Sequence, residues 1–205
     1  MFLQGSFSSI TSTFYVPFIY DQLKSPFAIF VGLDGISCPA FLRAGIDVKP
    51  RDGRPYYQGK EPLIHASTAY LTASFAWYEW YPKIRKEYFD IKVSAGDKVR
   101  ISVSSATPGL GVVIVENLSK NTQVGEELSA AEVICGQDAQ LAVAPHDIKV
   151  PLSNFDHFVF MDIEADSVQD PNERDWATLV DLQQGDKMMV QVSNLDGTIL
   201  VEHFV

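Results

Sequence analysis

Positive charge is scarce in this sequence. Lysine and arginine together number 16, against 26 aspartate and glutamate residues, which gives a formal net charge of −10. Nucleic-acid binding generally needs a basic stripe, so we expect no nucleic-acid partner. The two short basic clusters, Lys49–Arg54 and Lys83–Lys86, are interpreted as solvated loop faces.

Long apolar runs are also lacking. A membrane-spanning helix needs about 18 or more consecutive apolar residues, and no such stretch occurs, so we expect no membrane partner. The first residues, Met1–Gly5, have neither the basic start nor the apolar core of a secretory signal. From this we expect a cytoplasmic location rather than secretion.

Groups that hold metals or phosphates are equally few. The chain has 4 histidines and 2 cysteines, and no two histidines have metal-ligand spacing, so we expect no metal. Gly109–Gly111 is interpreted as a turn, because no helix follows it to cradle a phosphate. We therefore expect no cofactor.

What is present is a series of short β-rich runs. The chain is 46% hydrophobic and 20% charged over 205 residues, which suits one globular domain spanning residues 1–205. Short strands at this spacing predict an all-β fold, an antiparallel β-sandwich of the lectin-like jelly-roll type. The predicted strands are Phe7–Val16, Phe27–Leu33, Tyr88–Val93, Lys98–Ser104, Gly111–Glu116, Phe158–Glu164, Lys187–Val192 and Thr198–Phe204.

The most unusual segment is Phe75–Pro82, in which aromatic residues surround one carboxylate. Side chains alternate along a strand, so Trp77, Glu79 and Tyr81 should share one face. An acid between aromatics on one face is typical of a ligand site. The alternative is a core strand whose carboxylate is satisfied by hydrogen bonds.

This segment resembles a signature of the eqolisins, which are fungal and bacterial glutamic peptidases. The likeness extends from about Gly5 to Val205 and implies their β-sandwich fold. It is carried by the AWYEWYP stretch and by further motifs at Phe30–Gly35, Leu42–Asp47, Val93–Val99, Glu116–Leu118 and Cys135–Ala144.

The resemblance fails at the residues that carry the family's chemistry. Eqolisins hydrolyse peptides with a glutamate that deprotonates water and a glutamine that stabilises the oxyanion. Here Arg43 stands at the glutamine position, Ala144 at the glutamate position, and Gln140 replaces a further glutamate. A guanidinium can still stabilise an oxyanion, but a methyl group cannot accept a proton. We therefore expect a divergent member that is not a peptidase.

The resemblance also implies a disulfide between Cys38 and Cys135. In an oxidising compartment this bond would close a long loop. In the cytoplasm, the same residues would remain two buried thiols.

The resemblance places several strand faces along one concave cleft. In this cleft we expect the catalytic residues to be Arg43, His146, Glu79, Asp47 and Asp34. We expect the ligand-binding residues to be Phe30, Trp77, Tyr81, Gln140 and Ala144. A histidine among carboxylates suits proton transfer near neutral pH. The alternatives are that Arg43 only neutralises neighbouring acids, and that Pro145 turns His146 away from the cleft.

A longer connection than the family's joins Asp47 to Phe75, which predicts an inserted loop around residues 48–74. Long loops in compact domains are often lids. We expect Tyr56 or Tyr57 to close over a ligand, and the alternative is a surface hairpin without a role.

Three functions remain open at this point. The first is cofactor-free acid–base chemistry on a small organic substrate, as in an isomerase, cyclase or lyase. The second is a pseudoenzyme that binds a ligand or peptide, and the third is an acid endopeptidase with a dyad shifted onto Glu79 and Arg43. A homodimer is a further expectation, because a second chain could cover an unpaired sheet edge.

Overall fold

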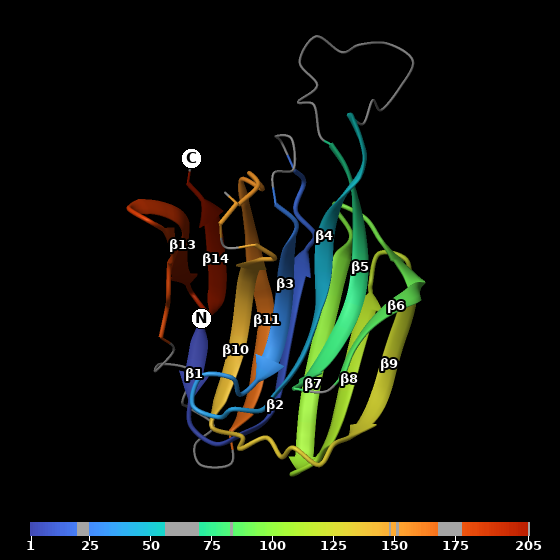
Figure 1. The fold of residues 1–205 in the computed structure, drawn as a ribbon, viewed down its shortest axis with the longest axis vertical. Coiled ribbons are helices and arrows are strands. Elements are labelled where there is room, and N and C mark those ends of the chain that lie inside the picture. The colour runs from blue at the N-terminus through green and yellow to red at the C-terminus, as the bar shows by residue number, and fades with distance from the viewer. Residues whose placement is uncertain are drawn as a thin grey trace.

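The computed structural model describes residues 1–19, 25–55, 70–82, 84–147, 149–150, 152–167 and 178–204. All the strand pairs in this part of the chain are antiparallel and form two sheets that pack face to face (Figure 1). The predicted all-β antiparallel sandwich is confirmed. The described part contains no helix that is long and apolar enough to cross a bilayer.

The six-stranded sheet has the order β1-β10-β3-β4-β5-β6. Its strands are β1 (Phe2–Gln4), β3 (Phe27–Leu33), β4 (Phe41–Pro55), β5 (Tyr70–Tyr81), β6 (Ile84–Val93) and β10 (Asp138–Pro145). The predicted insertion around residues 48–74 is in part a continuation of the hairpin, because β4 runs on to Pro55 and β5 starts at Tyr70. Tyr56 and Tyr57 lie outside the described residues.

The eight-stranded sheet has the order β12-β13-β14-β11-β2-β7-β8-β9. Its strands are β2 (Phe7–Tyr15), β7 (Lys98–Thr107), β8 (Leu110–Asn117), β9 (Thr122–Ser129), β11 (His157–Ser167), β12 (Leu182–Gln184), β13 (Lys187–Leu195) and β14 (Thr198–His203).

The core lies between the sheets and follows from strand alternation. Along β8 every second side chain is buried, which directs Val113 and Val115 inward. Along β5 the alternation directs Tyr78 and Trp80 into the core and leaves Trp77, Glu79 and Tyr81 on the other face. Trp80 is fully buried, and its indole Nε1 donates a hydrogen bond to the carbonyl of Glu132 at 2.9 Å. The outer face of the six-stranded sheet is therefore free to carry a site.

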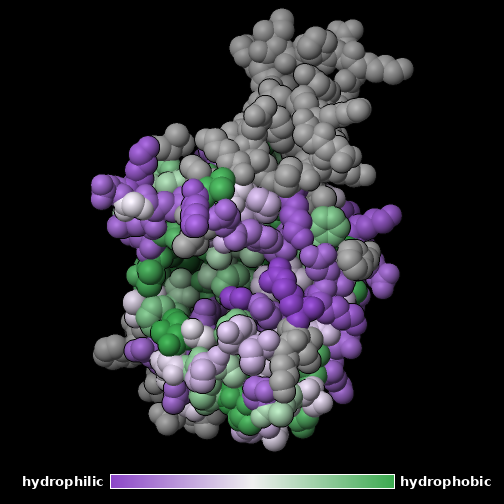
Figure 2. All heavy atoms as spheres, in the orientation of Figure 1, coloured by the Kyte–Doolittle hydropathy of each residue, from purple (hydrophilic) through white to green (hydrophobic). Residues whose placement is uncertain are grey.

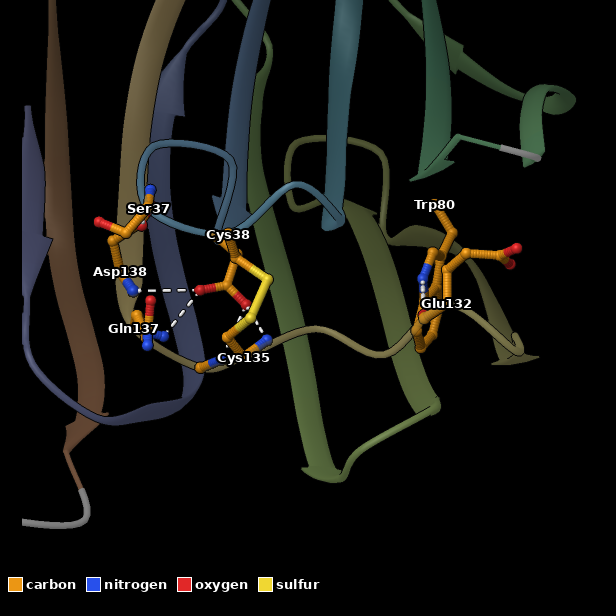
Figure 3. Close-up of a disulfide and its surroundings, with 9 residues drawn as sticks. Ser37, Cys38, Trp80, Glu132, Cys135, Gln137 and Asp138 are labelled. Atoms are coloured by element: carbon orange, nitrogen blue, oxygen red, sulfur yellow. Dashed lines mark hydrogen bonds between the residues drawn. A yellow bond between two sulfur atoms is a disulfide. The ribbon is translucent and has the colours of Figure 1, made fainter.

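A disulfide joins Cys38 to Cys135, with their Cα atoms 5.9 Å apart (Figure 3). It links the segment after β3 to the segment before β10. The bond implied by the family resemblance is present, and two free thiols are not.

Candidate active site

On the outer face of the six-stranded sheet, the strand register determines which side chains are neighbours. Arg43 on β4 pairs with Glu79 on β5, and Glu79 pairs with Arg85 on β6. In the next row, Gly45 lies between Phe30 and Trp77. These pairings bring side chains that are far apart in sequence onto one surface.

A cleft of about 430 Å³ lies on this face. Its apolar lining residues are Ala28, Phe30, Trp77, Ala144 and Pro145, and its charged or titratable ones are Arg43, Asp47, Lys49, Arg85, Glu87 and His146. Six of the twelve residues predicted for the site from sequence therefore line one cavity. Charged and titratable residues thus form slightly more than half of the lining, and apolar residues form the rest.

Gly45 makes this arrangement possible, because it lets two large side chains approach across the sheet. A Cβ atom at this position would lie 2.8 Å from Cζ2 of Trp77 and 2.8 Å from Cβ of Phe30. Trp77 is almost fully buried and contacts Phe30 at a ring-centroid distance of 6.2 Å. Together the two rings form the apolar wall of the cleft.

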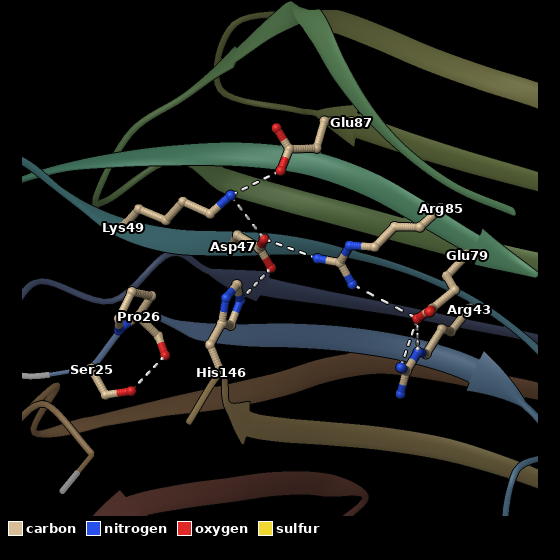
Figure 4. A network of polar contacts seen from close by, with 9 residues as sticks. All are labelled: Ser25, Pro26, Arg43, Asp47, Lys49, Glu79, Arg85, Glu87 and His146. Carbon is tan, nitrogen blue, oxygen red and sulfur yellow. Dashed lines mark hydrogen bonds and ion pairs between the residues drawn. The ribbon is translucent and has the colours of Figure 1, made fainter. Parts of the chain in front are cut away.

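Arg43 is held by both charge and aromatic contacts. Its Nε and Nη2 donate to Glu79 Oε2 at 2.9 and 2.6 Å (Figure 4). Its guanidinium carbon lies 4.2 Å from the ring centroid of Phe41 and 4.9 Å from that of Phe30. Both expected alternatives for Arg43 are compatible with this geometry, since it neutralises Glu79 and also lines the cleft.

Asp47 lies buried at the centre of the charged part of the cleft. Its carboxylate is fully buried, with Arg85 Nη2 at 3.0 Å and Lys49 Nζ at 3.3 Å from Oδ2. His146 Nε2 lies 3.0 Å from the other oxygen, Oδ1 (Figure 4). One carboxylate thus joins three basic side chains from β4, β6 and the end of β10.

Lys49 also pairs with Glu87 at 2.9 Å. Burial alone would lower the pKa of Lys49, but its hydrogen bond to Glu87 and the charge of Asp47 raise that pKa above its ordinary value. Lys49 is therefore a fixed positive charge at the rim.

His146 reaches the cleft although it follows a proline. The strand β10 ends at Pro145, and the backbone N–H of His146 donates to the carbonyl of Pro26 at 2.9 Å. This bond holds the backbone beside β3, and the ring lies against Asp47. His146 lines the cleft as expected, and the alternative, that Pro145 turns it away, does not hold.

Asp34 is a correction to the predicted site. It adopts a left-handed backbone, with φ of 62°, at the end of β3 and is almost fully buried. Its carboxylate accepts four backbone N–H bonds at 2.6 to 3.2 Å, from Cys135, Gly136, Gln137 and Asp138. These bonds occupy both oxygens, so Asp34 fastens the segment before β10 and does not line the cleft.

Gln140 and Tyr81 also lie outside the cleft. The amide of Gln140 donates to the carbonyl of Asp34 and to Asp138 Oδ1. Tyr81 is 46% exposed and stacks on Phe41, with ring centroids 4.8 Å apart. It is thus separated from the cavity by the ring that contacts Arg43.

Among the described residues, three potential metal ligands do come together, namely Asp34, Cys38 and Cys135. The two sulfur atoms are bonded to each other, and the carboxylate is taken up by backbone amides. The donor set therefore does not suit a metal ion.

Sequence reasoning missed three charged residues of the cleft, Lys49, Arg85 and Glu87. The first two belong to the basic clusters that were interpreted as solvated loops. Alternation was the available signal, because Arg85 and Glu87 are two residues apart on the strand that pairs with Glu79 and Trp77.

The sequence matches the peptidase A4 family over residues 2–203, and the chain belongs to that family. It is 27% identical over 180 residues to aspergillopepsin-2 of Aspergillus niger, covering 85% of this chain and 58% of the relative. It is 25% identical over 142 residues to scytalidopepsin B of Scytalidium lignicola, covering 68% of this chain and 47% of that relative. The chain thus spans about half the length of the curated relatives it matches.

Solved structures agree on the fold. Scytalido-glutamic peptidase with a transition state analog inhibitor superposes with a TM-score of 0.79 at 22% identity, covering 99% of this chain and 96% of that one. Aspergilloglutamic peptidase from Aspergillus niger gives a TM-score of 0.70 at 26% identity, covering 88% of this chain and 99% of that one.

Proposed function

We propose that this cleft performs acid–base chemistry on a small organic substrate without a cofactor, and that it does not hydrolyse peptides. The reaction type would be that of an isomerase, cyclase or lyase. The observation that carries the proposal is the contact of 3.0 Å between His146 Nε2 and the buried Asp47 Oδ1. A histidine beside a buried carboxylate is a recurring arrangement for moving protons.

The two residues would have different roles. Asp47 is inaccessible and would act as a positioning residue through its charge, since its Oδ1 lies 3.0 Å from His146 Nε2 without the geometry of a hydrogen bond. The His146 side chain is 33% exposed and lines the cavity, so its other ring nitrogen is the group that would exchange a proton with a substrate.

Arg43 would polarise a carbonyl oxygen of the substrate. Its Nε and Nη2 bond to Glu79, and no bond of Nη1 is seen within the described ranges, so Nη1 would be the nitrogen that donates to the substrate. Glu79 is less suited to proton transfer than His146, because its Oε2 is held by Arg43 and lies 3.7 Å from Arg85 Nη1.

The same contacts weigh against an acid peptidase with a dyad shifted onto Glu79 and Arg43, because these two residues are paired with each other. A ligand-binding pseudoenzyme remains the second candidate. It is favoured by the apolar wall of Phe30 and Trp77, which needs no chemistry to hold a ligand.

Proton transfer can be tested with a nitrobenzisoxazole, whose base-catalysed ring opening releases a coloured phenolate. We expect wild-type protein to accelerate this reaction and His146→Ala to lose about 10²- to 10⁴-fold of the acceleration. The matched control is His157→Ala, because His157 at the start of β11 contacts Asp156 at 3.1 Å in an exposed pair, and neither residue lines the cleft. Equal rates for wild type and His146→Ala would favour the binding function.

Peptidase activity is tested separately by digestion of an unfolded protein from acid to neutral pH. We expect no cleavage by wild type and some by the double variant Arg43→Gln, Ala144→Glu. Cleavage by wild type would refute the proposal.

We also propose an oxidising compartment instead of the cytoplasmic location expected from the sequence. A disulfide such as Cys38–Cys135 persists where thiols are not kept reduced.

A further inference from the structure

The accessible charge in the cleft of the outer face is mostly positive. The basic side chains that line it are 29 to 39% exposed, namely Arg43, Lys49, Arg85 and His146. Of the two acids that line it, Asp47 is fully buried and Glu87 pairs with Lys49. In Figure 2 hydrophilic side chains gather over the part of the molecule where β4, β5 and β6 lie. A ligand therefore meets a cationic surface, in a chain whose net charge is −10.

Arg85 on β6 is the most exposed of these basic side chains, and the proposed proton transfer does not use it. Its Nη2 donates to Asp47 Oδ2 at 3.0 Å, and its guanidinium carbon lies 4.2 Å from the ring centroid of Trp77. The carboxylate and the ring hold the guanidinium in place. Its Nη1 lies 3.7 Å from Glu79 Oε2, beyond hydrogen-bond distance, and no bond of Nη1 is seen in the part of the chain that the structure describes. Arg85 thus offers a fixed charge with a donor that a ligand can use.

The guanidinium groups of Arg43 and Arg85 lie beside one another. Glu79 Oε2 is 2.6 Å from Arg43 Nη2 and 3.7 Å from Arg85 Nη1. Both groups also approach the ring of Trp77, at 5.8 and 4.2 Å from its centroid. Two neighbouring guanidinium groups suit two neighbouring oxygen functions of one small molecule. A carboxylate is the planar anion that the fork of a guanidinium matches.

Small residues lie in the next row of the cleft. Ala28 on β3 pairs with Ala144 on β10 and with Asp47 on β4. It lies two residues along the strand from Phe30, about 7 Å away, and the ring of Phe30 contacts Arg43. Because both alanine side chains are single methyl groups, they leave room for an apolar group within the cleft.

We propose that the substrate of this cleft is a small 2-oxo acid, in which a carbonyl group is next to a carboxylate. Arg85 binds the carboxylate, Arg43 polarises the carbonyl oxygen, and the apolar part of the molecule lies against Ala28 and Ala144, towards His146. This substrate class rests on the proposed function, because Arg43 is taken there as the residue that binds the carbonyl.

The test measures binding of benzoylformate by isothermal titration calorimetry. This 2-oxo acid has no hydrogen on the carbons next to its carbonyl group, so binding is measured apart from proton transfer. The matched control ligand is benzoylformamide, which has the same ring and carbonyl but no charge. We expect wild-type protein to bind the acid about tenfold or more tightly than the amide.

On the protein side, Arg85→Gln should reduce this preference to about twofold or less. The control is Lys86→Gln, which removes the adjacent positive charge on β6. Lys86 pairs with Glu126 on β9 of the other sheet at 3.7 Å, so this variant should keep the preference. The comparison of acid and amide on wild-type protein does not depend on whether Arg85→Gln folds.

Two results would overturn the 2-oxo acid as the substrate class. One is that wild-type protein does not prefer the acid, including no binding of either ligand up to its solubility limit. The other is a preference that is unchanged in Arg85→Gln. Accelerated ring opening of the nitrobenzisoxazole alongside either result would leave the proposed proton transfer standing. Acid-specific binding through Arg85 without that acceleration would refute the proton transfer and support the ligand class.

Discussion

Arg43 and Glu79 face each other across β4 and β5, and two guanidinium nitrogens of Arg43 converge on one carboxylate oxygen. The side chains are 29% and 16% exposed, so the pair is largely removed from water. Loss of one partner should leave the other charge poorly compensated.

We therefore expect Glu79→Gln to lower the free energy of unfolding by about 1 to 3 kcal/mol, measured by urea titration. The control is Glu116→Gln, which breaks the pair of Glu116 with the more exposed Arg100 on the other sheet. That change should cost less than about 1 kcal/mol. Equal losses would mean that the aromatic rings, not Glu79, fix Arg43.

The close approach of Phe30 and Trp77 over Gly45 predicts an effect on the cleft itself. In Gly45→Ala, the new methyl group would also lie 2.5 Å from the carbonyl oxygen of Ile29, so the backbone must shift. We expect a loss of about 1 to 3 kcal/mol and altered fluorescence of the tryptophans. Gly197→Ala, in a turn with no atom within 4 Å of the added Cβ, should leave the fluorescence unchanged.

The disulfide predicts a dependence on redox conditions. Its loop has a sequence separation of 97, for which the chain-entropy model gives about 4 to 5 kcal/mol. The Cys38→Ser, Cys135→Ser double variant should therefore melt at a lower temperature than wild type in calorimetry. A reductant should lower the melting temperature of wild type and not that of the variant. A variant as stable as wild type would show that the hydrogen bonds of Asp34 suffice to hold this region.

Asp97 predicts a dependence on pH. Burial raises the pKa of its carboxyl, but hydrogen bonds from Lys120, Asn117 and the Ser94 N–H outweigh burial and lower that pKa overall. A lowered folded-state pKa contributes stability that is present above the unfolded value, about 4, and is lost as pH falls through the folded value.

The stability difference between wild type and Asp97→Asn should accordingly be largest near neutral pH and shrink in acid. Urea titrations at several pH values measure this difference. A difference that stays constant with pH would contradict the assignment of the shift to the charged carboxylate.

The sequence was sufficient to predict the sandwich and the shared face of Trp77 and Glu79, because strand alternation has a fixed period of two. It was not sufficient for Asp34. The same alternation places Asp34 on the face of Phe30, but a left-handed backbone at the strand end turns its carboxylate to the amides that follow Ile134. Such a turn depends on a segment about 100 residues away, which local sequence does not contain.

The rim charges were missed for a related reason. Charge clusters are usually solvated, so Lys49 and Arg85 were assigned to loops. Lys49 lies on β4 in the long β4–β5 hairpin, and Arg85 lies on β6. Which residues of these strands are neighbours depends on how the strands pair in the folded sheet. Lys49 and Arg85 both pair with Asp47. A buried carboxylate without partners would cost free energy.

The bond between Cys38 and Cys135 also has a mechanical consequence. If the chain were pulled by its two ends, the residues between these cysteines would bear no load while the bond is intact. At about 3.3 to 3.6 Å per residue, the chain would unravel to a contour length shorter by roughly 310 to 340 Å than its reduced form. The strands β4 to β9, which include three of the strands that carry the cleft residues, would be shielded from force until the bond is broken.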